Sequence, residues 1–232
     1  MTFRTKCEAT RYTGGLSKPE KMPCPAFSLQ PLVSCPVGAR LAAKPGTVCS
    51  VCYGTAKSGR YYRFAKTMIP LWQRRLAATQ LDGFTSAMAK LICGLPYFRW
   101  HDTGDVYSER YWQAIHDIAL ACPDTKFWLP TRELWIAKLP KPTNLTIRYA
   151  MPLVDQTAAQ VNRFLSLYTT VVTVTTDHSD PNLCRMVMKP SRDGKGVVRS
   201  CGDCRRCWEE GELVAYPLHS TGQGNSNSQV EV

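Results

Sequence analysis

Apolar positions in the middle of the chain follow two alternating periods, one typical of strands and one typical of helices. Short apolar runs occur at 97–100, 126–129, 145–150 and 171–175. Between them lie longer segments in which apolar residues recur every three or four positions, as on one face of a helix. This alternation predicts an α/β fold over 61–180, in which parallel strands joined by helices form an open sheet or part of a barrel.

Local signals indicate where several helices begin and end. The pattern over 61–94 predicts helix, interrupted near Pro70 and again at 82–83. Ser108 is expected to cap a following helix, and Asp155 to cap a later one. The apolar faces of these two helices contain Tyr111, Ile115, Ile118 and Ala119 in the first, and Val161, Phe164 and Leu165 in the second.

The two ends of the chain lack this pattern. Residues 1–60 are rich in Pro, Gly and Cys and predict a loop region, which at this length is normally functional or held by a ligand. Residues 181–218 form a second cysteine-containing segment, and 219–232 are polar and predict a disordered tail. A length of 232 residues allows all these parts to belong to one domain.

Composition and charge narrow the class of protein. No apolar run is long enough to cross a bilayer, and the first residues lack the apolar core of a secretory signal. We therefore expect a cytoplasmic protein without a membrane partner. The net charge of +11 permits a nucleic-acid substrate, but the basic residues are spread along the chain, and a solvated basic surface explains them equally well.

Eleven cysteines are many for a cytoplasmic chain, where stable disulfides are uncommon and clustered cysteines more often bind metal. Cys7, Cys93 and Cys122 stand apart from the others. We expect Cys93 and Cys122 to be small buried apolar residues near helix ends. The remaining cysteines form two groups, one toward each end of the chain.

The first group consists of Cys35, Cys49 and Cys52. Three thiolates can hold a [4Fe-4S] cluster whose fourth iron stays open to a small molecule, whereas four would close it for electron transfer. Ten residues separate Cys24 from Cys35. It is therefore either the fourth ligand of this site or a free thiol.

The second group consists of Cys184 followed by Cys201, Cys204 and Cys207. The last three are separated by two residues each, which is the local spacing of the iron–sulfur run in bacterial ferredoxins. Four thiolates can also hold structural zinc, but zinc ligands usually come as two separated pairs. The spacing therefore favours a [4Fe-4S] cluster.

Polar residues directly follow three of the predicted strands, at 101–105, 131–132 and 177–178. The carboxyl ends of parallel strands form one face of a sheet, and ligands bind there. The residues expected to take part in catalysis at this face are Asp102, Asp105, Arg132 and Asp177. Ordinary roles remain as alternatives, namely an aspartate that caps a helix and an ion pair between Arg132 and Glu133.

Seven segments of this sequence together resemble the phage gene product 88 family, which is itself similar to radical-SAM-type iron–sulfur barrel proteins. These segments are 25–29, 35–36, 49–53, 99–105, 127–132, 201–208 and 214–217. The resemblance implies a phage origin, a partial (β/α) barrel with a cysteine-rich N-terminal loop and a C-terminal cluster-binding extension, and a host-cytoplasmic location. It does not specify a reaction.

Radical-SAM enzymes hold a cluster by three cysteines, and S-adenosylmethionine binds the fourth iron through its amino and carboxylate groups. The resemblance implies that the first cysteine group takes those positions, with Tyr53 near the adenine and 103–105 near the methionyl amine. The residues assigned to cofactor binding are Tyr53, His101, Thr103, Gly104 and Thr131. Thirteen residues separate Cys35 from Cys49, which is a wider spacing than in those enzymes.

Three functions fit these observations, in descending order. The first is a radical-SAM-type enzyme with two [4Fe-4S] clusters, S-adenosylmethionine, a small-molecule or nucleic-acid substrate and a reductase partner. The second is a non-catalytic cluster protein for electron transfer or sensing, in which Cys24 completes the first site. The third is a zinc-stabilised nucleic-acid-binding protein.

Overall fold

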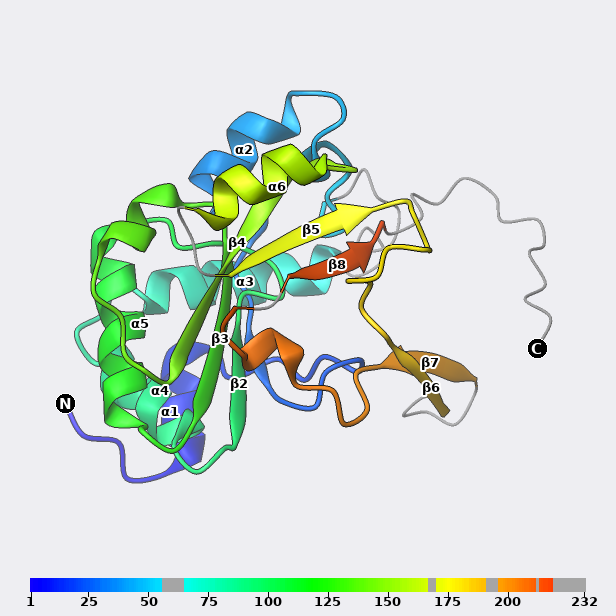
Figure 1. Cartoon of the computed structure of the whole chain (residues 1–232). Helices are drawn as coiled ribbons and strands as arrows, with labels where there is room; N and C mark the ends of the chain where they lie inside the picture. Colours follow the sequence, from blue (N-terminus) through cyan, green and yellow to red (C-terminus); the bar gives the residue numbers. More distant parts are fainter. Residues whose placement is uncertain (56–64, 167–169, 191–195, 212, 219–232) are drawn as a thin grey trace.

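The fold is built on a six-stranded sheet, seen in a computed structural model that describes residues 1–55, 65–166, 170–190, 196–211 and 213–218. The sheet order is β1-β2-β3-β4-β5-β8, and every neighbouring pair is parallel (Figure 1). Within the described residues β1 and β8 are its two edges, so the sheet is open. Its strands are β1 (Ala26–Phe27), β2 (Tyr97–Trp100), β3 (Lys126–Thr131), β4 (Leu145–Val154), β5 (Val171–Thr175) and β8 (Val214–Pro217).

The four predicted strands are confirmed as β2, β3, β4 and β5. Their apolar runs are buried because helices cover the sheet, as the alternation of periods predicted. The edge strands β1 and β8 were not predicted, since each is short and lies in a segment rich in turn residues or cysteines. The predicted tail at 219–232 lies outside the described residues.

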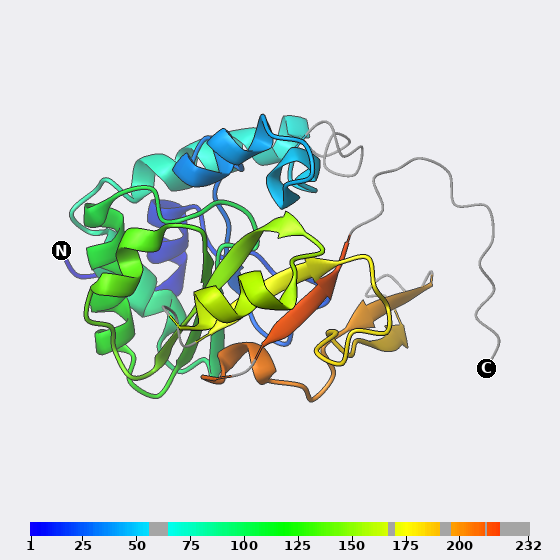
Figure 2. The same cartoon turned by 45° about the horizontal axis from the view of Figure 1, so that its top comes forward.

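Helices pack beside the sheet in two groups. Figures 1 and 2 show α1, α4 and α5 together beside the β1–β3 half, whereas α6 lies beside β5. The α-helices are α1 (Lys6–Thr13), α2 (Pro36–Ala42), α3 (Ala65–Ala78), α4 (Phe84–Ile92), α5 (Glu109–Ala121) and α6 (Ala158–Leu165), and the 3-10 helices are η1 (Val48–Val51), η3 (Leu134–Lys138) and η4 (Arg206–Trp208). None of the helices in the described ranges combines the length and the apolar character that crossing a bilayer requires.

The N-terminal region contains regular structure, so the prediction of a continuous loop over 1–60 is wrong for its described part, 1–55. Helix α1 begins with a capping box in which the Thr5 side chain accepts a hydrogen bond from the backbone N–H of Glu8, and the Glu8 side chain accepts one from Thr5. Helix α2 and η1 follow later in the same region. Both carry cysteines of the first group at their ends.

Two of the predicted helix boundaries are wrong, and two are confirmed. Pro70 lies inside α3, because the packing of the buried Trp72 and Arg75 keeps the helix continuous across the missing N–H. Thr157, not Asp155, caps α6 through a capping box. The interruption at 82–83 and the cap at Ser108 are both observed.

Cys93 and Cys122 form a disulfide that joins the C-terminal ends of α4 and α5. The prediction that both are buried apolar residues is wrong for Cys93, which is exposed, whereas Cys122 is buried in the core as predicted, although it is bonded to Cys93. The two helices pack against each other, which brings their ends within bonding distance.

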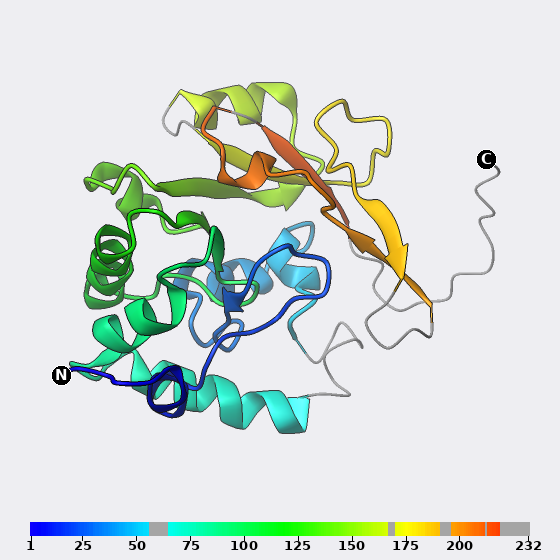
Figure 3. The same cartoon turned by 90° about the horizontal axis from the view of Figure 1, so that it is seen from below.

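A separate two-stranded ribbon projects from the body of the protein. Strands β6 (Val187–Pro190) and β7 (Val197–Ser200) pair antiparallel and do not join the main sheet. Figure 3 shows the ribbon extending beyond the ends of the main strands. Its two ends lead directly into cysteines of the second group.

Candidate functional site

A cavity of about 550 Å³ opens at the carboxyl ends of the parallel strands, and its lining is mostly apolar. The ends of β2, β3 and β8 contribute His101, Thr131 and Pro217 to its wall. Both predicted cysteine groups open onto this one cavity. The cysteines that line it are Cys35, Cys49 and Cys52 from the first group and Cys184, Cys201 and Cys207 from the second.

The three cysteines of the first group are brought together by α2 and η1. Cys35 directly precedes α2, Cys49 lies in η1 and Cys52 ends it. A Cβ atom added to Gly38 would lie 3.5 Å from the Cys49 Sγ and 3.9 Å from the Cys35 Sγ, so both sulfurs face the space that this glycine leaves free. Burial raises the pKa of Cys35 to about 12, and the negative charges of Asp105 and the neighbouring thiolates add to the effect.

Glu133 holds the start of α2, although the sequence suggested only an ion pair with Arg132. Its Oε1 accepts a hydrogen bond of 3.0 Å from the backbone N–H of Val37, and its Oε2 accepts one from Trp135. Both carboxylate oxygens are thus used, and Glu133 positions the helix that follows Cys35. No ion pair between Arg132 and Glu133 is present among the described residues.

Gly104, which was assigned to cofactor binding, lies instead against the segment that precedes Cys35. Gly104 has a φ of 94°, and an added Cβ would lie 2.7 Å from the Leu29 Cβ and 2.9 Å from the Ser34 Oγ. Thr103 donates its hydroxyl to the carbonyl of Leu29, and the backbone N–H of Asp105 donates to the carbonyl of Ser34. These contacts fix the segment that leads into Cys35.

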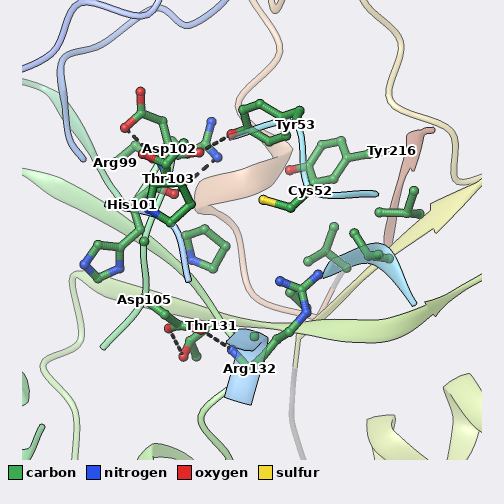
Figure 4. Close-up of a pocket in the computed structure, with 18 of the residues that line it drawn as sticks. Cys52, Tyr53, Arg99, His101, Asp102, Thr103, Asp105, Thr131, Arg132 and Tyr216 are labelled. Carbon is green, nitrogen blue, oxygen red and sulfur yellow. Dashed lines mark hydrogen bonds between the residues drawn. The ribbon is translucent and has the colours of Figure 1, made fainter. Parts of the chain in front are cut away.

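Asp105 is a buried carboxylate with three hydrogen-bond donors. Its oxygens accept bonds from the Thr131 hydroxyl at 2.6 Å, the Arg132 N–H at 3.0 Å and the Val106 N–H at 2.8 Å. Burial raises the pKa of Asp105 to about 6, although these bonds oppose the shift. Its role is to tie the end of β3 to the end of β2 (Figure 4), rather than to present a free carboxylate.

Arg132 places a positive charge at the first cysteine group. Figure 4 shows its side chain extending from the end of β3 toward the side of the cavity that holds Cys52. Burial raises the pKa of Cys49 and of Cys52, and the charge of Arg132 opposes both shifts. Its Nε atom is buried without a hydrogen-bond partner among the described residues. The guanidinium is therefore placed to pair with an anion in the cavity.

Arg99, which the sequence did not single out, lines the cavity beside the second cysteine group. Its guanidinium stacks on Trp128, with 4.5 Å from its carbon to the ring centroid. Figure 4 shows Arg99 beside Asp102 and Tyr53, and the Tyr53 hydroxyl donates to the carbonyl of Asp102. Burial raises the pKa of Cys207, and Arg99 is one of the charges that oppose this shift.

His101 contributes to the cavity wall, but its ring belongs to the core. The residue is 2% exposed, and its Nε2 lies 3.0 Å from the Tyr111 hydroxyl oxygen. Figure 4 shows the imidazole turned away from Cys52 and Arg132. Burial and then the charge of Arg99 lower the pKa of His101 to about 3, so the ring is neutral. Contact between this ring and a bound cofactor, as predicted, does not fit this orientation.

Three backbone hydrogen bonds position the second cysteine group, two of them to other segments of the chain and one within the group. The N–H of Cys184 donates to Ala215 in β8, the N–H of Cys201 donates to Lys21, and the N–H of Cys204 donates to Cys201. Burial raises the pKa of Cys184 to about 12, and the thiolates of the other three members raise it further. The other three members thus lie close enough for their charges to act on Cys184.

Arg148 was not predicted to have a role, and it organises the second group from inside the sheet. It is fully buried in β4, where its Nε donates to the carbonyl of Cys207 at 3.0 Å and its Nη2 to that of Glu209 at 2.7 Å. Thr146 donates to the carbonyl of Trp208. The sequence contained a signal for this role, namely an arginine within the apolar run 145–150. A cation buried in a strand requires hydrogen-bond partners, so Arg148 could have been expected to bind a neighbouring segment.

Cys24 lies beside the second group. It is 7% exposed and packs with Trp128, Cys207 and Trp208. Burial raises its pKa to about 12, with the charge of Arg99 opposing and the Cys201 thiolate adding to the shift. The alternative in which Cys24 completes the first site does not match this position.

Asp177 was predicted to join the other polar residues at the strand ends, and the structure does not bring it there. It is exposed, outside the cavity wall, and accepts hydrogen bonds from the backbone N–H and the hydroxyl of Ser179. These bonds lower the pKa of Asp177. After β5 the chain leads away from the cavity, and Asp177 stabilises a turn at the surface through its bonds to Ser179.

The donor set matches the chemistry of an iron–sulfur cluster. Thiolates are the ligands that such clusters use, and each group offers at least three. Among the described residues, no three His, Cys, Asp or Glu side chains are drawn together closely enough to hold one metal ion. A four-iron cluster is larger than a single ion, so its thiolate ligands need not lie as close together as those of one ion.

The fold and the cavity define an α/β protein with an open parallel sheet, in which two groups of cysteines share one strand-end cavity. The chain belongs to the gene product 88 family, whose model matches residues 2–210. This match confirms the family part of the resemblance. Neither the curated proteins nor the solved structures that were compared with this chain gave a match.

Proposed function

We propose that this protein is an iron–sulfur protein of radical-SAM type, with one [4Fe-4S] cluster at each cysteine group and its open sheet serving as a partial barrel. The observation that carries the proposal is that both cysteine groups open onto one cavity at the carboxyl ends of parallel strands. Ligand sites of parallel α/β folds lie at this face.

The first group fits a cluster with one iron that lacks a protein ligand. Cys35, Cys49 and Cys52 supply three thiolates, and Cys24 lies beside the other group. Gly38 leaves space next to two of the sulfurs. When bound, such a cluster supplies the electron that cleaves S-adenosylmethionine into methionine and a 5′-deoxyadenosyl group.

Residues of this chain would hold S-adenosylmethionine at that end of the cavity. Arg132 would pair with the carboxylate of its methionyl part, in the geometry that guanidinium and carboxylate groups favour. Tyr53, held by its bond to the Asp102 carbonyl, supplies an aromatic ring beside Cys52 for the adenine. The apolar remainder of the wall would keep water from the reactive group.

The second group would carry electrons to this site. Its four thiolates are sufficient to close a cluster against further ligands. Arg99, stacked on Trp128 beside the second group, provides a fixed positive charge that stabilises additional negative charge there. This arrangement favours a closed electron-carrying cluster next to an open one.

The test is metal analysis of protein purified without oxygen, followed by titration with S-adenosylmethionine. We expect about eight irons per chain from two four-iron clusters. Cys52→Ala should remove about half of them, and the control Cys7→Ala none. S-adenosylmethionine should change the electron paramagnetic resonance spectrum of the reduced protein and yield 5′-deoxyadenosine.

Each alternative function has its own outcome in this test. If both clusters are present but S-adenosylmethionine neither changes their spectrum nor yields 5′-deoxyadenosine, the function would be electron transfer or sensing instead. Colourless protein that contains zinc and no iron would exclude the iron–sulfur proposal and favour a zinc-stabilised nucleic-acid-binding protein.

A further inference from the structure

The β6–β7 ribbon begins and ends at the second cysteine group. Cys184 lies three residues before Val187, the first residue of β6, and Cys201 directly follows Ser200, the last residue of β7. Val187 and Ser200 are partners in the ladder, so the base of the ribbon closes next to both cysteines. Figures 1 and 3 show that the rest of the ribbon extends away from the main sheet.

The ribbon exposes large apolar side chains. Val187 is 51%, Met188 is 60% and Val197 is 65% exposed, which places all three among the most exposed apolar residues of the described chain. A two-stranded ribbon that packs on little else is only marginally stable in water. Exposed apolar side chains grouped on such an element mark an interaction site.

The same segment is strongly basic. Between Cys184 and Cys201 the sequence contains one acidic residue, and Arg185 and Arg199 are exposed. The basic residues of the segment are Arg185, Lys189, Arg192, Lys195 and Arg199, and the acidic one is Asp193. The exposed Arg185 and Arg199, at the two ends of the ribbon next to the cysteines, attract an acidic partner.

The combination of apolar and basic side chains favours a protein over a nucleic acid. Met and Arg are both enriched at protein–protein interfaces, where an apolar centre is surrounded by a charged rim. Binding to nucleic acid depends mainly on cations against phosphates and leaves no role for Val187, Met188 and Val197.

We propose that the β6–β7 ribbon is the docking surface for an acidic protein that donates single electrons and delivers them to the second cysteine group. This inference rests on the proposed function, because it requires a cluster at Cys184, Cys201, Cys204 and Cys207. One electron leaves the reduced donor protein, which is thereby oxidised by one electron, and enters the oxidised cluster, whose charge falls by one. No bond to the protein forms or breaks in this step.

The experiment compares two reductants of the second cluster, an acidic flavodoxin kept reduced by its reductase and the small ion dithionite. The test variants are the double charge reversal Arg185→Glu/Arg199→Glu and the apolar change Met188→Asp. The matched control is Lys126→Glu/Lys138→Glu, whose lysines are exposed and lie away from the ribbon in β3 and η3. Binding of oxidised flavodoxin is measured in parallel by calorimetry.

We expect both test variants to slow reduction by flavodoxin by about tenfold or more, as electrostatic steering and a lost interface contact require. The dissociation constant for flavodoxin should rise accordingly, and the charge reversal should weaken the salt dependence of the rate. Reduction by dithionite should be unchanged in every variant, because a small ion needs no docking surface.

Several results would overturn the inference while leaving the proposed function intact. One is a wild-type cluster that dithionite reduces and flavodoxin does not; another is equal rates with flavodoxin in all variants. If the charge reversal weakened binding of a duplex oligonucleotide and left flavodoxin binding unchanged, the ribbon would be a nucleic-acid surface instead. Failure of the proposed function looks different, since no chromophore would then respond to dithionite.

Discussion

The hydroxyl oxygen of Tyr216 lies 3.0 Å from the Sγ atom of Cys207. Tyr216 belongs to the edge strand β8 and Cys207 to η4, so this contact joins the last strand of the sheet to the second cysteine group. Burial raises the pKa of Tyr216 well above its usual value, which keeps the phenol protonated and able to donate. A cluster held by Cys207 would therefore have a hydrogen bond to one of its sulfurs.

Removal of this hydroxyl should lower the reduction potential of the second cluster. A hydrogen bond to a ligand sulfur stabilises the more negative, reduced state. Tyr216→Phe should shift the potential downward by about 40 mV, equivalent to roughly 1 kcal/mol for a one-electron couple. A redox titration followed by electron paramagnetic resonance measures the shift. Tyr107→Phe, which removes a hydroxyl bonded to Thr79 instead, is the control, and equal potentials in both variants would contradict the assignment.

A methyl group at Gly38 should abolish the first cluster and spare the second. An added Cβ would press against the Cys35 Cβ at 2.9 Å and fill the space beside the Cys49 sulfur. Gly38→Ala should therefore bind about four fewer irons than wild type. Helical alanine is otherwise favourable relative to glycine, so the fold should persist by circular dichroism. Gly196→Ala, where no atom lies within 4 Å of the added Cβ, should keep its full iron content.

The strand pattern and the cysteine groups were predictable because their signals are local. A buried parallel strand is a short apolar run, and β2 to β5 each contain one. Cys201, Cys204 and Cys207 are held by one short segment, so spacing alone brings their sulfurs together. The position of Asp105 near Arg132 followed from the rule that parallel strands end at one face.

The remaining features depend on contacts between distant parts of the chain. Only ten residues separate Cys24 from Cys35, yet the position of Cys24 is set by packing on Trp128 and Trp208. The bond between Arg148 and the carbonyl of Cys207 spans 59 positions. Asp177 follows a strand like the other polar residues, but the direction of the chain after β5 takes it to the surface. No local pattern carries this information.

Arg148 should be required for the second cysteine group to assemble. Arg148→Met would leave the buried carbonyl of Cys207 without its donor and remove the bond to Glu209, which together cost about 3 kcal/mol or more. We expect a loss of the second cluster with retention of the first, measured by iron content and by the resonance of each cluster. Arg148→Lys keeps the charge without the fork of donors and should recover only part of the iron.

The disulfide between Cys93 and Cys122 should add to stability without affecting either cluster site. It closes a loop with a sequence separation of 29. The loop-entropy estimate for this length is about 3.5 kcal/mol. Cys93→Ser should lower the free energy of unfolding in urea by roughly this amount, whereas Cys7→Ser, at an exposed free thiol, should have little effect. Equal stabilities for the two variants would show that the bond contributes nothing.

Protonation of His101 should destabilise the fold in acid. Its pKa is lowered from 6.5 to about 3 by burial and by the charge of Arg99, so between these values the unfolded chain binds a proton that the folded chain does not. Stability therefore falls as the pH falls below 6.5, by about 2 kcal/mol at pH 5 from this residue alone. His101→Asn should flatten the dependence of unfolding free energy on pH over 5 to 7, since asparagine tolerates the φ of 53° and does not titrate. The control is His178→Asn at an exposed position, which should keep the wild-type dependence of unfolding free energy on pH. If His101→Asn also keeps the wild-type dependence, another residue causes the acid sensitivity.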